Sequence, residues 1–197
     1  MITPEINKYD ALLFLDLDGV INCQTFYEER YKNLTKYDGV PFYKTVKKYL
    51  RKLIKTKQIT KMDYYRGEMC PMRMGWLNEL CAELNLGVVL SASMRAQYSV
   101  DELQTIFNEC GATFTIIDKT GHCESRIRGV EINDWLHENV EKWFDVKYYD
   151  FYKFVIIDDD SDMLLNQQYN FFQTDNYSGL TPSTCYRIKR FLTHKTF

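Results

Sequence analysis

ALLFLDLDGVIN, residues 11–22, carries the clearest structural signal in this 197-residue chain. Its apolar half is typical of a strand that is buried on both faces and ends in a polar loop. In open α/β sheets, ligands bind just beyond such strand ends. Asp16 and Asp18 lie there, and two carboxylates this close repel each other unless a proton or a cation lies between them. The segment therefore suggests a metal site.

The composition is that of a soluble globular protein. Hydrophobic residues make up 45% and charged residues 26% of the chain, which is too apolar for intrinsic disorder. The length suffices for one core with a small inserted lid. No apolar run approaches the roughly 20 residues that span a bilayer, and the first residues lack the basic and apolar parts of a signal peptide. We therefore expect a cytoplasmic protein without a membrane partner.

The cysteines and histidines give no sign of a metal site. The six cysteines include no CxxC pair, so we expect reduced thiols that pack as small apolar groups. The three histidines are far apart and make no zinc-binding pattern with the cysteines. The candidate metal ligands are therefore the carboxylates.

Charge is distributed unevenly along the chain. From Glu28 to Arg73 there are 13 Lys and Arg against 5 Asp and Glu, a balance of +8, so the remainder carries −10 to reach the net charge of −2. In this part Val46, Leu50 and Leu53 recur at helical spacing, which predicts a basic amphipathic helix. Its opposite side is expected to hold Lys47, Lys48, Lys52 and Lys55. We predict that residues 23–74 form an inserted basic cap and that residues 1–22 and 75–197 form the core domain.

The rest of the chain alternates strands with helices. Apolar runs predict strands near residues 87–93, 113–118, 153–158 and 170–174, and amphipathic patterns predict helices at residues 72–86, 99–111, 130–143, 161–168 and 181–192. Gly87 is expected to cap the first of these helices, and Thr181 with Pro182 the last. The pattern predicts an α/β fold, a three-layer α/β/α sandwich with a mainly parallel, Rossmann-like sheet of about five strands and a small inserted, largely helical cap.

Polar groups beyond the strand ends could supply the parts of phosphoryl transfer. Asp16 could attack phosphorus and form an aspartyl phosphate. Asp18 could protonate the leaving oxygen and then activate water. Gly19 would let the loop turn sharply and bring backbone N–H groups to the phosphate. Ser91, at the end of the second strand, could hold a phosphate oxygen, although a serine at a strand end more often only caps a turn or a helix.

The run VIIDDDSDM places four carboxylates within five residues. Asp158, Asp159, Asp160 and Asp162 would repel one another unless a divalent cation lay among them, and hard oxygen ligands of this kind suit Mg²⁺. We assign Asp158 to the metal, with Asp159 as an alternate ligand. An acidic cluster that caps a helix N-terminus is the competing interpretation, but four acids exceed what a cap needs.

The motifs carry a resemblance to a known family. Asp-Leu-Asp-Gly-Val after a hydrophobic strand resembles the first motif of the haloacid dehalogenase (HAD) superfamily, and VIIDDDSDM resembles its fourth. The segments LSASMR, RIRGVEINDWL and FFQTDNYSGLT are similar to a branch of that superfamily associated with nucleic acid repair proteins. Met94, where that branch has a large aromatic residue, and the lysine-rich insertion depart from its pattern. The resemblance covers most of the chain outside residues 23–74.

The resemblance implies roles for individual residues. In such a phosphatase Asp16 is the nucleophile and Asp18 is the general acid and base. Ser91 then stands for the second motif and Arg128 for the cation of the third, with Arg126 and Lys119 as alternatives. The implied metal is Mg²⁺, with Asp16, Asp18, Asp158 and Asp159 as candidate ligands. The candidate substrate-binding residues are Gly19, Ser93, Arg95, Arg126, Asp162, Lys47, Lys48 and Lys52.

We therefore expect a Mg²⁺-dependent phosphatase that acts through an aspartyl phosphate. The basic cap would attract a polyanion such as a 3′- or 5′-phosphate end of nucleic acid. Interleaved aromatic residues favour this substrate because rings stack on bases; they are Tyr31, Tyr37, Tyr43, Tyr49, Tyr64 and Tyr65. Two alternatives stay open, a phosphatase for nucleotides or other small molecules and a non-catalytic nucleic-acid-binding module with this fold.

Overall fold

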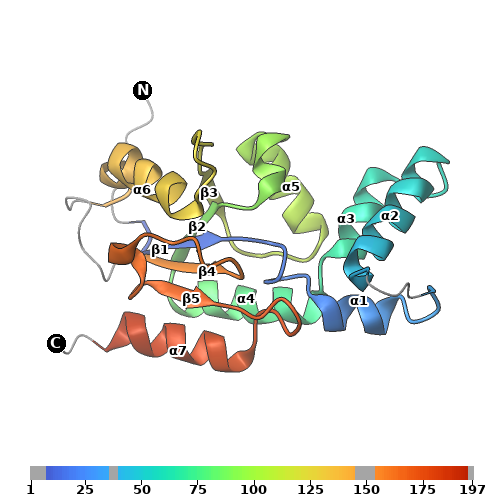
Figure 1. Ribbon diagram of the computed structural model, residues 1–197. Coiled ribbons are helices and arrows are strands. Elements are labelled where there is room, and N and C mark those ends of the chain that lie inside the picture. Colours follow the sequence, from blue (N-terminus) through green and yellow to red (C-terminus); the bar gives the residue numbers. More distant parts are fainter. Residues whose placement is uncertain (1–7, 36–39, 145–153, 195–197) are drawn as a thin grey trace.

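The computed structural model describes residues 8–35, 40–144 and 154–194 (Figure 1). Its centre is a five-stranded sheet in the order β3-β2-β1-β4-β5, and every strand pair in it is parallel. The strands are β1 (Ala11–Leu15), β2 (Leu86–Leu90), β3 (Ile116–Lys119), β4 (Phe154–Asp158) and β5 (Phe171–Gln173). The predicted α/β fold with a parallel sheet is confirmed.

The apolar runs form the central strands because both faces of the sheet are covered. All five residues of β1 are buried. Successive side chains of a strand point to opposite faces, so Leu13 and Leu15 join one hydrophobic cluster while Leu12 and Phe14 join another. A strand with this environment has no polar face, which explains why its sequence is uniformly apolar rather than alternating.

Four helices cover the sheet in two layers. They are α4 (Pro71–Glu83), α5 (Val100–Glu109), α6 (Arg128–Asn139) and α7 (Pro182–Thr193). Residues of α4, α5 and α7 pack in one cluster and residues of α6 pack in the other; in Figure 1, α4 and α7 lie below the sheet and α6 above it. Three short 3-10 helices follow strands or α6: η1 (Ser93–Ala96), η2 (Val140–Lys142) and η3 (Leu165–Gln167). Across the described residues, we find no helix with the length and apolar character needed to cross a bilayer.

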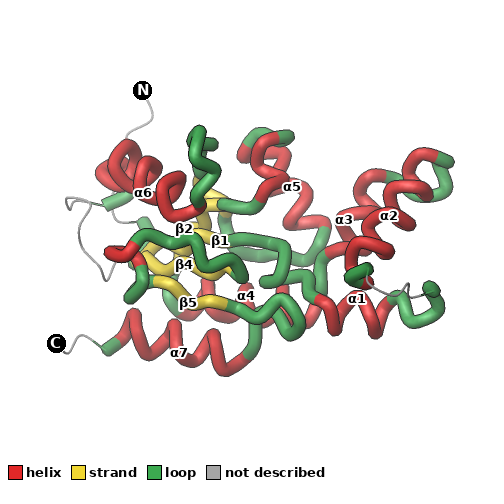
Figure 2. The backbone as a smooth tube through the Cα atoms, in the orientation of Figure 1, coloured by secondary structure: helices red, strands yellow, loops and turns green. Residues whose placement is uncertain are grey.

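A helical insertion lies between β1 and α4. It contains α1 (Gln24–Arg30), α2 (Phe42–Lys55) and α3 (Lys61–Glu68), which share a separate hydrophobic cluster that includes Phe26, Val46 and Leu50. The three helices stand beyond the carboxyl ends of the strands (Figure 1). The backbone view in Figure 2 shows long loops between those strand ends and α1. The insertion therefore faces the edge of the sheet where chemistry is expected.

Two local predictions are wrong. Gly87 does not cap a helix, because it lies inside β2, where a Cβ atom would crowd Ile117 and Tyr9; the preceding helix ends at Glu83 and Asn85 takes the left-handed conformation, with φ of 47°. Residues 161–168 do not form a helix, since only the short η3 is present there. In contrast, Thr181 accepts a hydrogen bond from the backbone N–H of Thr184, as a helix cap does.

Candidate active site

The strand order creates a crevice beside β1. From β1 the chain moves to β2 and β3 on one side, and only then to β4 and β5 on the other side. The carboxyl ends of β1 and β4 therefore border the switch point at which open α/β sheets bind ligands. Asp16 follows β1 directly and Asp158 is the last residue of β4, while the backbone N–H of Asp16 donates to the Ile157 carbonyl over 3.0 Å. Two predicted acidic residues thus meet at this edge.

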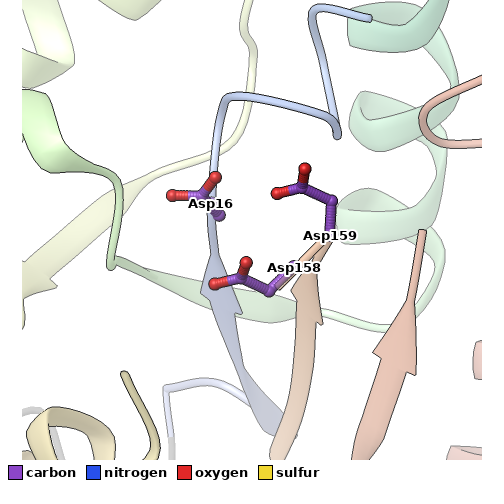
Figure 3. Close-up of side chains that lie close together, drawn as sticks. All are labelled: Asp16, Asp158 and Asp159. Carbon is purple, nitrogen blue, oxygen red and sulfur yellow. The ribbon is translucent and has the colours of Figure 1, made fainter. Parts of the chain in front are cut away.

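Three carboxylates gather in the crevice. Asp16, Asp158 and Asp159 each offer an oxygen, and these atoms lie within 4.8 Å of one another. Figure 3 shows the side chains at the ends of β1 and β4 with their carboxylates facing a common space. Burial, and next the charge of Asp158, raise the pKa of Asp16 well above its usual range. Burial raises the pKa of Asp158 and of Asp159 to about 6, so the negative charges are poorly compensated without a cation.

Gly19 makes this convergence sterically possible. Its φ is +71°, a conformation that glycine adopts at little cost, and a Cβ atom there would overlap the carboxyl group of Asp159. The Thr174 hydroxyl donates to the Gly19 carbonyl over 2.8 Å and holds the turn in place. Gly19 is predicted to bring backbone N–H groups toward a phosphate. In addition, its lack of a side chain leaves room for the carboxyl group of Asp159.

Arg128 joins the strand ends through one guanidinium group. Its Nη2 lies 3.4 Å from Asp16 Oδ1 and its Nε lies 3.1 Å from Asp158 Oδ2, and Nη1 donates to the Ser91 carbonyl. In the described part of the chain, neither of the other two candidates for this cation pairs with Asp16 or Asp158, although Arg126 shares a cavity with Arg128. Lys119 Nζ donates to the carbonyls of Arg95 and Tyr98, and Arg126 is an exposed loop residue.

Asp162 positions Arg128 from the loop after β4. The backbone N–H of Arg128, at the start of α6, donates to Asp162 Oδ2 over 2.8 Å, and the N–H of Gly129 donates to the Asp162 carbonyl over 3.2 Å. A carboxylate at a helix N-terminus is stabilised by the free N–H groups and the helix dipole. The helix-capping interpretation of the acidic run thus holds for Asp162, while Asp158 and Asp159 belong to the carboxylate cluster.

Ser91 presents a buried hydroxyl without a partner. The residue is fully buried, and within the described part of the chain its Oγ makes no hydrogen bond. Its backbone is fully engaged, because the N–H donates to the Leu15 carbonyl over 2.9 Å and the carbonyl accepts from Arg95 and Arg128. An unsatisfied buried hydroxyl costs free energy. Ser91 Oγ is therefore a candidate to donate a hydrogen bond to an oxygen of a ligand. Ser93, by contrast, is exposed and lines the cavities next to it.

Arg95 is a buried residue that links α6 to the segments that follow β2 and β3. Its side chain is 2% exposed and its Nη2 lies 2.5 Å from Glu131 Oε2, while other guanidinium atoms donate to the carbonyls of Thr120 and Ser91. Burial lowers the pKa of Arg95. Its predicted role in substrate binding stays a prediction, since Arg95 also lines a cavity of about 480 Å³ together with Arg128. Glu131, which the sequence analysis missed, also lies 3.3 Å from Arg128 Nη1 and thereby orients both arginines.

The second aspartate of the first motif faces the insertion. Asp18 is outside the carboxylate cluster, and its Oδ1 accepts from Asn22 Nδ2 over 2.9 Å and pairs with Lys47 Nζ at 2.7 Å. Lys47 is only 16% exposed, so its predicted position on the solvent side of α2 is wrong. Lys48 and Lys52 are exposed, and they line a groove on another side of the helix. Lys47 lies on a different side of α2 from Lys48 and Lys52 because of the helical period. Residues three and four apart share a face, so residues 47, 51 and 54 line the site together.

Two cavities adjoin the aspartates of the first motif. One, of about 330 Å³, is lined by Gly19, Arg128 and Asp159. The other, of about 350 Å³, is lined by Lys47 and Arg51 of α2 and by Glu68 of α3. Asp16, Asp18 and Ser93 line both. The arrangement can therefore hold a small anionic group beside the carboxylate cluster and a larger attached group against the insertion.

One known protein family matches most of the chain. The family described as the HAD domain in Swiss Army Knife RNA repair proteins matches residues 12–185, which run from β1 through the helical insertion into α7. No curated protein and no solved structure matches the chain significantly.

Replacing Glu131 by Gln should destabilise the fold. The variant leaves the buried Arg95 without its anionic partner, which typically costs about 3–5 kcal/mol. Urea unfolding followed by circular dichroism measures the loss of unfolding free energy. Glu83→Gln is the matched control, because its pair with Lys189 is on the surface and should contribute at most about 1 kcal/mol. Equal stabilities of the two variants would contradict the supporting role of Glu131.

Magnesium should stabilise the protein more at about pH 7.5 than at about pH 5. In the folded state the pKa values of Asp158 and Asp159 are about 6 against an ordinary 3.8, so without metal these groups favour folding at low pH and that contribution is lost as the pH rises through 6. Protons compete with the cation for the same oxygens. At tenfold its Kd, Mg²⁺ should add about 1.4 kcal/mol, or about 3–6 °C in Tm, at the higher pH. Calorimetry that shows the same increment at both pH values, or an increment that survives Asp158→Asn, would argue against a metal at these carboxylates.

Proposed function

The chain belongs to the HAD domains of Swiss Army Knife RNA repair proteins, and we propose that it is a Mg²⁺-dependent phosphomonoester phosphatase that works through an aspartyl phosphate on Asp16. The observation that carries the proposal is the convergence of Asp158, Asp159 and Arg128 on that one carboxylate. A nucleophilic carboxylate has to approach a phosphate that is itself negative, and Arg128 together with a cation held by Asp158 and Asp159 would supply the positive charge that makes this approach feasible.

The chain's own residues account for both half-reactions. In the first, an oxygen of Asp16 attacks phosphorus, the bond from phosphorus to the leaving oxygen breaks, and Asp18 gives its proton to that oxygen. In the second, Asp18 takes a proton from water, the hydroxide attacks phosphorus, and the bond to Asp16 breaks to release inorganic phosphate. Asp18 lies two residues from Asp16 and lines the same two cavities, so it can serve both steps.

Several groups would stabilise the negative charge on the phosphoryl group during its transfer. Arg128 lies against Asp16 and would contact the phosphate oxygens beside it. Ser91 Oγ, buried and unpartnered, would donate a hydrogen bond to one of them. The raised pKa values of Asp158 and Asp159 fit a site that lacks positive charge. These two residues and Asp16 would hold Mg²⁺, which would supply positive charge to the phosphate during transfer.

We further propose that residues 23–74 act as a cap that selects the substrate and that phosphate ends of nucleic acid are that substrate. The family's link to RNA repair supports the second point, and so do Lys47, Arg51 and Lys61 along the larger cavity. Fewer of the cap tyrosines are available to stack on bases than the sequence suggested. Tyr65 is buried with its hydroxyl 2.6 Å from that of Tyr98, and Tyr31 donates to the Gly67 carbonyl.

Of the remaining tyrosines named for base stacking, two are half-buried and one, Tyr49, is exposed at the groove of Lys48 and Lys52. Tyr37 lies outside the described residues. Recognition by this cap would therefore depend mainly on cations.

Replacing Asp16 and Asp18 by Asn should give different defects. Asp16→Asn should reduce Mg²⁺-dependent hydrolysis of an aryl phosphate to background, since no nucleophile remains. Asp18→Asn should slow turnover by about 10²–10⁴-fold, yet it should accumulate phosphorylated protein, because a phenolate leaves without a proton while water still needs a base. Intact-protein mass spectrometry detects the adduct. Asp175→Asn is the control, as Asp175 caps a turn by accepting from Tyr177 N–H; an active Asp16→Asn variant would refute the nucleophile.

Phosphorylated oligonucleotides should be hydrolysed faster than an aryl phosphate, and salt should reduce the difference. Each phosphate contact releases counterions, so binding of single strands weakens steeply as salt rises. Alanine at Lys48, Lys52 and Lys55, all exposed on α2, should lower kcat/KM for a longer oligonucleotide and leave the aryl phosphate unchanged. The measurement is kcat/KM for 3′- and 5′-phosphorylated strands at several salt concentrations. A preference for free nucleotides that salt does not affect would favour a small-molecule phosphatase instead.

A further inference from the structure

The two cavities at the first motif differ in the groups that they offer. The smaller one contains Arg128 and Asp159, which belong to the phosphate and metal side of the proposed reaction. The larger one shares Asp16 and Asp18 with it but is otherwise walled by α2, α3 and the residues after β2. Asp18, which would protonate the leaving oxygen, borders both cavities, but its partner Lys47 lines only the larger one, and the phosphate and metal groups line the smaller one. The larger cavity is therefore where the leaving group belongs.

Glu68, in the wall of this cavity, has one carboxylate oxygen that lacks a hydrogen-bond donor among the described residues. The residue is 5% exposed, and its Oε1 makes no hydrogen bond to any of the described residues. Lys47 Nζ lies 3.9 Å away, which is too far for a hydrogen bond but close enough to favour the carboxylate form. Burial raises the pKa of Glu68, and the charge of Lys47 and a hydrogen bond from Tyr64 oppose this. A buried acceptor beside an open cavity fits a ligand that donates a hydrogen bond.

Three cationic side chains line the same cavity as Glu68. Arg51 and Lys61 line the cavity together with Lys47. Lys47 is already paired with Asp18, and Lys61 lies 4.5 Å above the Tyr98 ring. Arg51 is exposed, and it also lines the groove formed by Lys48, Lys52 and Lys55. Since Arg51 lines both spaces, it can meet an anionic group of a ligand that extends from the cavity toward the groove.

The size of the cavity limits what can occupy it. Its volume is about 350 Å³, which is at the lower end for small-molecule sites, roughly 300–1,000 Å³. Leu17, Ala92 and Met94 add apolar surface to the wall of this cavity. One nucleoside fits such a space, whereas a duplex end does not.

We propose that this cavity is the leaving-group site and that it takes the terminal nucleoside of a nucleic acid strand, which donates a hydrogen bond to Glu68 and directs its next phosphodiester to Arg51. The inference rests on the proposed phosphatase function and makes its substrate specific. The donor is either a sugar hydroxyl or an exocyclic amino group of the base, and both would satisfy the same carboxylate oxygen.

The test compares Glu68→Gln with the wild type on matched substrates. The substrates are an aryl phosphate, which offers no donor, and phosphorylated dinucleotides that vary in sugar, ribose or deoxyribose, and in base, with or without an exocyclic amino group. Loss of the charged acceptor should lower kcat/KM for donor-bearing dinucleotides by about ten- to a hundredfold and change the aryl phosphate by less than about threefold. An effect confined to ribose assigns the sugar hydroxyl, and one confined to amino-bearing bases assigns the base.

Arg51→Ala tests the second contact. It should raise KM for dinucleotides about tenfold, because the phosphodiester loses a charged partner, and it should affect mononucleotides and the aryl phosphate much less, because they carry no phosphodiester. Lys44→Ala is the matched control, since Lys44 is an exposed cation on the same helix that does not line this cavity. Equal effects of the two variants would mean that helix charge as a whole, and not the cavity, recognises the substrate, which would overturn the proposal.

Binding separates this inference from the proposed function. Calorimetry in the Asp16→Asn background measures dinucleotide affinity without turnover, and Glu68→Gln should weaken it by the same ten- to hundredfold. If the wild type hydrolyses no substrate but this loss of affinity is seen, the phosphatase proposal fails and the nucleoside site stands. If hydrolysis of the aryl phosphate is normal but Glu68→Gln affects neither affinity nor kcat/KM for any dinucleotide, the nucleoside site is wrong and the phosphatase proposal stands.

Discussion

Electrostatic repulsion among three carboxylates is the constraint on which the rest of this structure depends. Asp16, Asp158 and Asp159 bring their oxygens within 4.8 Å of one another in a mostly buried crevice, and Arg128 is the guanidinium that reaches two of them. Burial is the main cause of the raised pKa values of these acids, and neighbouring carboxylates raise them further, Asp158 for Asp16, Asp159 for Asp158 and Asp160 for Asp159. Such a cluster persists because the sheet order fixes β1 beside β4 and Gly19 leaves room for Asp159. A divalent cation is the natural counterpart.

The position of Arg128 is set by neighbours that do not touch the reacting space. Asp162 accepts from its backbone N–H, and Glu131 lies one helical turn further along α6. Glu131 in turn pairs with the buried Arg95, which ties α6 to the carbonyls at the end of β2. Asp16, Ser91, Arg128 and Asp158 are therefore linked by one network of hydrogen bonds and ion pairs.

The sequence predicted what depends on local pattern. The uniformly apolar β1, the acids after β1 and β4, and the cap at Thr181 are set by neighbours along the chain, and the parallel sheet follows from their alternation. Contacts between distant segments were not predictable. Glu131 appeared as an ordinary acidic residue in the first turn of a helix, and nothing near Glu68 in the sequence indicated a buried acceptor. Lys47 was placed with Lys48 and Lys52 because charge alone does not reveal which lysine of a basic helix faces Asp18.

The carboxylate cluster should hold a divalent cation next to Asp16. Diffraction from crystals grown with Mn²⁺, which takes the same oxygen ligands, measures this directly through the anomalous signal of the ion. One strong peak is expected among the carboxylates of Asp16, Asp158 and Asp159. A peak only at the exposed Asp160 and Asp162, or no peak in crystals that contain the ion in solution, would contradict it.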